Sequence, residues 1–176
     1  MFKTLIIALM CCCGYQAVAQ PETRISATHT DNATATWDFL CERYALTGIL
    51  SVQLTKTAKG AGLRLSATVS DPAYYIGGTV YLFLADNTII TCTDKGMRYM
   101  QQHTAIANYV LTTAEINKLK TTRITDIRFA ILGRESAFSS QTGNFTAINR
   151  KQYFDVYNDR NANAYPTETE IAELYK

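Results

Sequence analysis

Two cysteines and two histidines are the residues best suited to nucleophilic chemistry. Outside the first 19 residues the cysteines are Cys41 and Cys92, and the chain has only two histidines, His29 and His103. A cysteine beside a histidine base can act as an activated nucleophile, but no nucleophile motif surrounds either cysteine, and the polar neighbours of His103 favour a solvated strand residue. Zinc would need a second Cys/His cluster. We therefore expect no catalytic residue, no metal site and no cofactor here.

The first 19 residues, MFKTLIIALMCCCGYQAVA, are typical of an export signal. Lys3 supplies the positive start, residues 5–13 form an unbroken apolar run, and residues 17–19 (AVA) offer a small-residue cleavage site before Gln20. The alternative is a lipoprotein anchored at one of the three consecutive cysteines, 11–13, but none follows a small residue. The mature protein is therefore predicted to be periplasmic or extracellular.

Export changes the interpretation of the remaining pair, Cys41 and Cys92. An even pair in an oxidising compartment favours a disulfide, and the closed loop of about 50 residues would contribute about 4 kcal/mol in the chain-entropy model. The alternative is two buried free thiols that pack as small apolar groups. The spacing does not choose between them.

Carboxylates are scattered along the chain. Glycoside hydrolysis needs two of them about 5 to 10 Å apart, and no sequence motif brings such a pair together. The oxygen-rich runs at residues 31–32 and 155–159 lack the spacing of an EF-hand calcium loop.

Tyrosines offer a different chemistry, which is recognition. Tyr74 and Tyr75 lie in an expected loop beside Gly77 and Gly78, and exposed loop aromatics can stack on sugar rings or anchor protein contacts. We expect Tyr99 to join them if the three share one face. Arg128 stands in an apolar strand, where pairing with an acidic neighbour or reaching solvent is expected rather than ligand binding.

The charge pattern excludes some partners. The formal net charge is +2 at pH 7, and removing Lys3 with the signal leaves +1. No basic block marks a nucleic-acid surface, and the apolar run of residues 5–13 is shorter than the 20 or so residues that span a bilayer. We predict an unknown protein or glycan as partner, no nucleic acid, and no transmembrane segment in the mature chain.

Alternating apolar residues predict most strands. Residues 46–55 and 63–69 flank a glycine-bearing turn at 56–62, and residues 79–85 and 88–93 flank a tight Asp86-Asn87 turn. Further strands are expected at 103–111, 124–132 and 145–148, while residues 37–44 could start either a strand or a helix. Residues 70–78 are predicted to be a loop, and residues 95–102 an irregular bridge.

Capping patterns predict the helices. Thr112 with Glu115 forms a capping box before a short helix, and Asn149 with Gln152 repeats it for a helix to about residue 158, with a strand over 152–157 as the alternative. Thr167 with Glu170 starts a last short helix.

These elements predict a mainly β fold, with α+β as the alternative. The expected architecture is a small antiparallel β-sandwich or partial barrel with two or three short helices. The domains are a signal at 1–19, a loose arm or edge strand at 20–36, one β-rich domain at 37–158, and a linker with a short helix at 159–176.

The stretch 79–131 combines a strand (TVYLFLA), a DN turn, a second strand (TIITCT), an LTxxEIxxL helix and a strand opened by IxxIR. This arrangement resembles uncharacterised secreted proteins of Gram-negative bacteria. The resemblance implies export and fold, and no activity. Together these patterns favour a non-enzymatic secreted binding module that uses loop aromatics, with a small extracellular hydrolase of glycans or peptides as the alternative.

Overall fold

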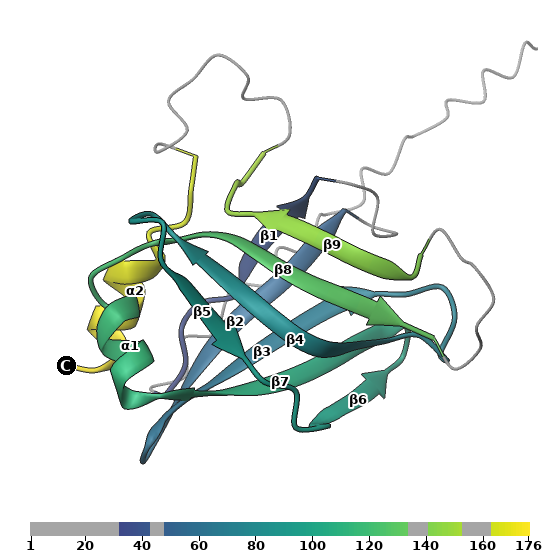
Figure 1. Ribbon diagram of the computed structural model, residues 1–176, viewed down its shortest axis with the longest axis horizontal. Coiled ribbons are helices and arrows are strands. Elements are labelled where there is room, and N and C mark those ends of the chain that lie inside the picture. The colour runs from purple at the N-terminus through teal and green to yellow at the C-terminus, as the bar shows by residue number, and fades with distance from the viewer. Residues whose placement is uncertain (1–31, 43–47, 134–140, 153–162) are drawn as a thin grey trace, which may run out of the picture.

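The computed structural model describes residues 32–42, 48–133, 141–152 and 163–176. Within them the chain forms nine strands and two helices (Figure 1). The strands are β1 (Trp37–Cys41), β2 (Ile49–Thr57), β3 (Gly60–Thr68), β4 (Tyr75–Leu84), β5 (Ile89–Cys92), β6 (Arg98–Gln101), β7 (Thr104–Thr112), β8 (Ile124–Leu132) and β9 (Gly143–Ile148). The helices are α1 (Thr113–Leu119) and α2 (Thr167–Leu174).

All nine strands belong to one antiparallel sheet, in the order β5-β4-β8-β9-β1-β2-β3-β7-β6. The sheet curls into a half-barrel, so the mainly β prediction is confirmed and the partial barrel is the form it takes. β5 and β6 are the two edges of this sheet. The curl brings them toward each other, so that β4 contacts β6 and β7, and β5 contacts β7.

The core fills the concave side of the sheet. Strands expose and bury alternate residues, so each apolar alternation in the sequence becomes one inward row. The largest fully buried side chains include Trp37, Phe39, Leu63, Leu82, Tyr109 and Phe129.

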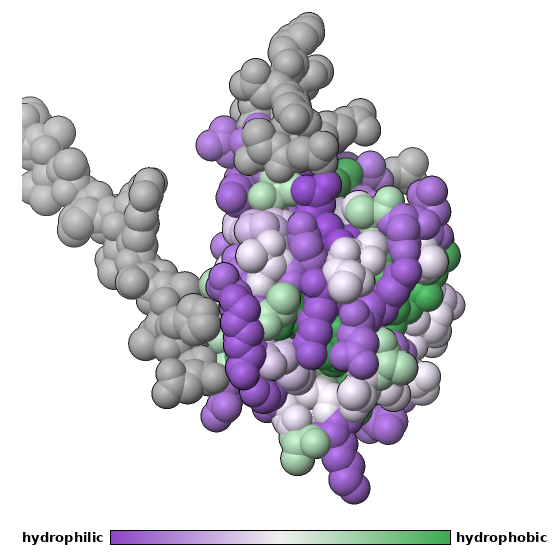
Figure 2. Space-filling model, turned by 90° about the vertical axis from the view of Figure 1, so that its left-hand side faces the viewer, coloured by the Kyte–Doolittle hydropathy of each residue, from purple (hydrophilic) through white to green (hydrophobic). Residues whose placement is uncertain are grey.

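Helix α1 follows β7 directly. Thr112 is its N-cap, and the reciprocal hydrogen bonds with Glu115 form the predicted capping box. Its buried residues, Ile116 and Leu119, join the core. α1 and α2 lie together at one end of the half-barrel (Figure 1). Seen toward that end, the surface is mostly hydrophilic, with hydrophobic residues in small separate areas (Figure 2).

Buried polar contacts hold the C-terminal segment against the sheet. The Trp37 indole N–H donates to Glu170 (2.9 Å), and the backbone N–H of Ile124 donates to the buried Thr167 hydroxyl (3.0 Å). Thr167 is thus the first residue of α2, and its hydroxyl oxygen accepts a hydrogen bond from β8. Pro166 is the N-cap of α2. The predicted last short helix is confirmed, and it begins at Thr167.

The predicted helix from Asn149 does not begin there, since residues 149–152 are irregular. The Asn149 amide donates to the carbonyls of Ile124 (2.8 Å) and Tyr165 (3.0 Å), and accepts from the Tyr165 N–H (2.7 Å). A side chain engaged in these tertiary bonds is not available to cap a helix. The rest of that predicted helix and its strand alternative, residues 153–158, lie outside the described residues.

Pairing also moves several predicted boundaries. The turn expected over 56–62 shrinks to two residues, because β2 and β3 pair up to Thr57 and Gly60. Tyr75, Gly77 and Gly78 belong to β4, which carries a register shift after Gly77. Residues 98–101, expected in an irregular bridge, form β6 by pairing with β7. Residues 37–41 form a strand.

The described part of the N-terminal arm is not loose. The Thr34 N–H donates to the Leu54 carbonyl (2.9 Å), and the Leu54 N–H donates back to the Thr34 hydroxyl (3.1 Å). Ala33 forms a β-bridge with Thr55. Residues 32–34 therefore lie along β2 through an isolated bridge rather than a strand, and residues 20–31 are outside the described part.

Cys41 and Cys92 are free and buried. Three strands, β9, β8 and β4, separate β1 from β5 in the sheet. Neighbouring strands lie about 4.8 Å apart, whereas a disulfide needs its Cα atoms within about 7 Å. Of the two alternatives for this pair, the structure has the buried thiols.

Burial should make both thiols inert in the folded protein. It raises the pKa of Cys41 to about 11, and burial together with the charge of Glu115 raises the pKa of Cys92 to about 12. We expect no reaction of either with a disulfide-exchange reagent at pH 7 in buffer, and reaction of both in denaturant. Peptide mapping by mass spectrometry identifies the labelled positions; a peptide in which Cys41 is linked to Cys92 would contradict this structure.

In the described part of the chain, neither helix has the length and apolar character needed to span a membrane.

Candidate functional site

The three tyrosines singled out in the sequence line one pocket. It has a volume of about 420 Å³ and lies between the turn before β4 and the edge strand β6. We call it the tyrosine groove; its lining residues are Pro72, Ala73, Tyr74, Tyr75, Arg98, Tyr99 and Met100. Tyr99 comes from β6, so two lining segments that are 23 positions apart in sequence, from Tyr75 to Arg98, meet here through the curl of the sheet.

A tight turn fixes the first wall of the groove. The Asp71 side chain accepts the Ala73 N–H (2.8 Å), and the Asp71 carbonyl accepts the Tyr74 N–H (3.0 Å). The Tyr74 ring lies against Gly133, where an added Cβ would be 3.2 Å from the ring. Tyr74 is half-buried and packs against the core. It thus forms the floor of the groove.

Arg98 forms the second wall together with Tyr75. Its guanidinium lies 4.6 Å from the centre of the Tyr75 ring and 3.4 Å from the Asp94 carboxylate. The stack needs a glycine at position 77, where an added Cβ would lie 2.4 Å from an Arg98 nitrogen and 2.9 Å from the Tyr75 ring. The Gly77-Gly78 pair therefore makes room for a cation over an aromatic ring.

Asp94 holds the groove to β4. Its carboxylate accepts the N–H of Gly78 (2.8 Å) and that of Gly96 (2.7 Å), besides pairing with Arg98. Partial burial acts to raise the pKa of Asp94, but these two hydrogen bonds and the Arg98 charge outweigh it and lower the pKa below its usual value. The Gly78 carbonyl in turn accepts the Tyr109 hydroxyl (3.2 Å).

The lowered pKa gives Asp94 a pH-dependent contribution to stability. Because its pKa is lower in the folded than in the unfolded chain, ionised Asp94 stabilises the fold above the ordinary value of 3.8, and this is lost as the pH falls through the folded pKa. We expect Asp94→Asn to cost about 1 kcal/mol at pH 7, since water screens part of the interaction. Urea unfolding at pH 7 and pH 3 measures it, and a difference from wild type that does not shrink at pH 3 would contradict this role.

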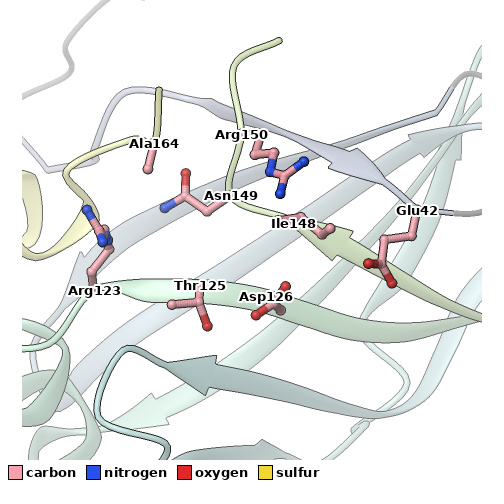
Figure 3. A pocket seen from close by; sticks show the side chains of 8 residues that line it. All are labelled: Glu42, Arg123, Thr125, Asp126, Ile148, Asn149, Arg150 and Ala164. Carbon is pink, nitrogen blue, oxygen red and sulfur yellow. The ribbon is translucent and has the colours of Figure 1, made fainter. Parts of the chain in front are cut away.

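A second pocket carries charged residues of both signs (Figure 3). It has a volume of about 380 Å³ and lies over β8, β9 and the end of β1; its lining residues are Glu42, Arg123, Thr125, Asp126, Ile148, Asn149, Arg150 and Ala164. Asp126 on β8 is opposite Ile148 on β9, which in turn is opposite Leu40 on β1. Glu42 follows Leu40 by two residues, so it is displaced from Asp126 by two strand spacings across the sheet and two residues along it. From strand geometry their Cα atoms are about 12 Å apart.

The other candidates lie apart from both pockets. His103 is an exposed residue in the turn between β6 and β7, whereas both cysteines are buried in the core, so no Cys–His pair forms among the described residues. Arg128 is exposed on the outer face of β8, with its guanidinium 5.4 Å from the centre of the Phe83 ring. His29 lies outside the described residues, which contain no cluster of three or more potential metal ligands.

Comparisons of the chain with family models, curated proteins and solved structures find no match. The resemblance to secreted Gram-negative proteins stays a prediction.

Arg98 and Met100 are the groove residues that sequence reasoning missed. Both lie in residues 95–102, which were expected to be irregular because this segment has no alternation of apolar and polar residues. The spacing of Asp94 and Arg98, four residues apart before an aromatic residue, was a weak signal for an ion pair.

Proposed function

We propose that this chain is an exported, non-enzymatic binding protein that recognises a protein or glycan through the tyrosine groove. The observation that carries the proposal is the meeting of Tyr74, Tyr75 and Tyr99 in one groove. The export part rests on the signal pattern of residues 1–19.

The groove has the composition of a recognition site. Aromatic rings, methionine and arginine are enriched at binding interfaces because they offer large contact areas and oriented donors. Tyr99 is 50% exposed, so its ring is available to a ligand without rearrangement. Tyr75 and Arg98 are held by the contacts with Gly77 and Asp94, which lowers the entropic cost of binding.

Loss of two groove tyrosines should remove binding. Glycan-array and pull-down experiments with the exported protein identify a ligand, and Tyr74→Ala with Tyr75→Ala should weaken its binding at least about 100-fold, as the loss of two central aromatic contacts does. The matched control is Tyr81→Ala, which removes a tyrosine that is 38% exposed on β4 outside the groove. Equal binding by the double variant and by wild type would exclude the groove as the site.

A carboxylate-dependent hydrolase is the second candidate, because Glu42 and Asp126 line one pocket. Glu42 is exposed to solvent, which suits a catalytic carboxyl less well than a shielded position. Assays on polysaccharide and peptide substrates with Glu42→Gln and Asp126→Asn test it: activity that disappears in both variants would replace binding as the main function.

A further inference from the structure

β6 is an edge strand with one unpaired side. β7 pairs with it on one side, and no described strand lies on the other. The Asn108 N–H donates to the Met97 carbonyl (2.8 Å), which marks Met97 and Asn108 as a hydrogen-bonded pair. Because such pairs alternate with non-hydrogen-bonded ones along an antiparallel ladder, Arg98 and Met100 direct their backbone groups away from β7.

Among the described residues, the backbone groups of β6 that are left without a strand partner are thus the Arg98 carbonyl and the Met100 N–H and carbonyl, since the Arg98 N–H already donates to the Gly96 carbonyl (2.9 Å). Arg98, Tyr99 and Met100 all line the tyrosine groove. Hydrogen-bonding positions of a strand and aromatic side chains therefore occur at the same place.

We propose that the tyrosine groove binds an extended peptide, which adds to the free edge of β6 as a further strand. This inference rests on the proposed function and names its ligand class. A peptide residue opposite Met100 would accept the Met100 N–H and donate to the Met100 carbonyl, in the manner of strand addition.

The ring contacts favour a peptide over a sugar. A sugar stacks on an open ring face, but the Arg98 guanidinium lies over the Tyr75 ring and Gly133 lies against Tyr74. Among the three tyrosines, Tyr99 is the most exposed. A guanidinium stacked on Tyr75 and paired on one side with Asp94 keeps further N–H donors for a carbonyl or carboxylate of a peptide.

The alternation of β6 predicts what the peptide presents. Met100 packs against the core, so Arg98 and Met100 face one side of the sheet and Tyr99 faces the other. An added strand would place alternate side chains on these two sides. We expect an apolar or aromatic residue beside Tyr99, and a residue with a hydrogen-bond acceptor beside Arg98.

The test is a selection of nine-residue peptides from a displayed random library on the exported protein, followed by an N-methyl scan of the best binder. N-methylation removes one backbone donor at a time. We expect affinity to fall about tenfold or more at alternate positions and to change little between them, because only every second N–H of an added strand faces β6.

Variants of β6 complete the test. Met100→Pro removes the free N–H and should abolish peptide binding, whereas Met100→Leu keeps that N–H and should retain it. Thr91→Pro on β5 is the control for a proline in an edge strand. Ile90 and Leu82 form a hydrogen-bonded pair, so the N–H of the next residue, Thr91, also points away from the neighbouring strand, β4. Circular dichroism confirms that each variant folds.

The outcomes separate the two proposals. A period-two loss in the N-methyl scan, with binding lost in Met100→Pro alone, supports strand addition. Peptide binding without that period, or binding of glycans alone that still depends on the groove tyrosines, overturns strand addition and leaves the proposed function standing. Binding of peptides and glycans that is unaffected by every groove variant overturns both.

Discussion

Replacing Gly60 by alanine is expected to lower the free energy of unfolding by about 3 kcal/mol or more. Gly60 begins β3 at a φ of +148°, a conformation that side chains rarely adopt, and an added Cβ would lie 2.0 Å from the Leu111 carbonyl oxygen. That oxygen belongs to the backbone of β7 and cannot rotate away, so β3 and β7 would have to separate. The Gly60 carbonyl also accepts the Tyr175 hydroxyl (2.6 Å), which such a shift would disturb.

Gly62, two residues along the same strand, is the matched control. An added Cβ there meets nothing within 4 Å, and the residue has no positive φ. Gly62→Ala should therefore change stability by no more than about 0.5 kcal/mol. Urea unfolding of both variants beside the wild type measures the contrast, and equal stabilities for the two would show that the clash with Leu111 is absent in solution.

Replacing Asn149 by alanine is expected to cost about 3 kcal/mol. Its buried amide makes three hydrogen bonds, to Ile124 and Tyr165, and the loss leaves the Ile124 carbonyl and the Tyr165 N–H without this partner. A buried polar group left unpaired costs about 1 to 3 kcal/mol, and two such groups are affected. The residues that lead into α2 should loosen first, because Tyr165 lies two residues before the start of that helix.

Asn144→Ala provides the comparison, since Asn144 lies five residues earlier, in β9, with an exposed side chain. It should be close to neutral. Hydrogen exchange resolves the effect by position: faster exchange in α2 of Asn149→Ala alone agrees with the role of Asn149, and unchanged exchange there would argue against it.

The parts of the fold that follow from local pattern could be predicted. The strand at 124–132 and the capped helix after Thr112 appear at the expected positions. Both signals, the alternation of buried apolar residues and the capping box, depend only on residues close together in sequence. A tight turn also lies at the expected place, but it is longer than the predicted two residues: β4 ends at Leu84, β5 begins at Ile89, and Asn87 has a φ of 65°.

Elements that depend on distant partners could not be predicted. β6 has little alternation and forms because β7 supplies its hydrogen bonds. Asn149 carries the residues of a capping box, but its amide serves Ile124 and Tyr165, which local sequence does not reveal. In both cases tertiary hydrogen bonds override the local signal.

The candidate site divides in the same way. The tyrosines attracted attention by residue type, and the curl of the sheet brings them into one groove. The contribution of Arg98 depends on Gly77, Asp94 and the Tyr75 ring together, so it becomes visible only once β4 and β6 are neighbours in space.

The central claim is that ligands bind in the tyrosine groove, and chemical-shift mapping tests it most directly. Backbone amide signals of the labelled protein are followed while a ligand found by peptide selection or glycan array is added. We predict that the largest shifts cluster at residues 73–75 and 98–100, and that Tyr74→Ala with Tyr75→Ala abolishes them. Shifts centred instead on Glu42, Asp126 and Arg150, in the charged pocket of Figure 3, would contradict the claim.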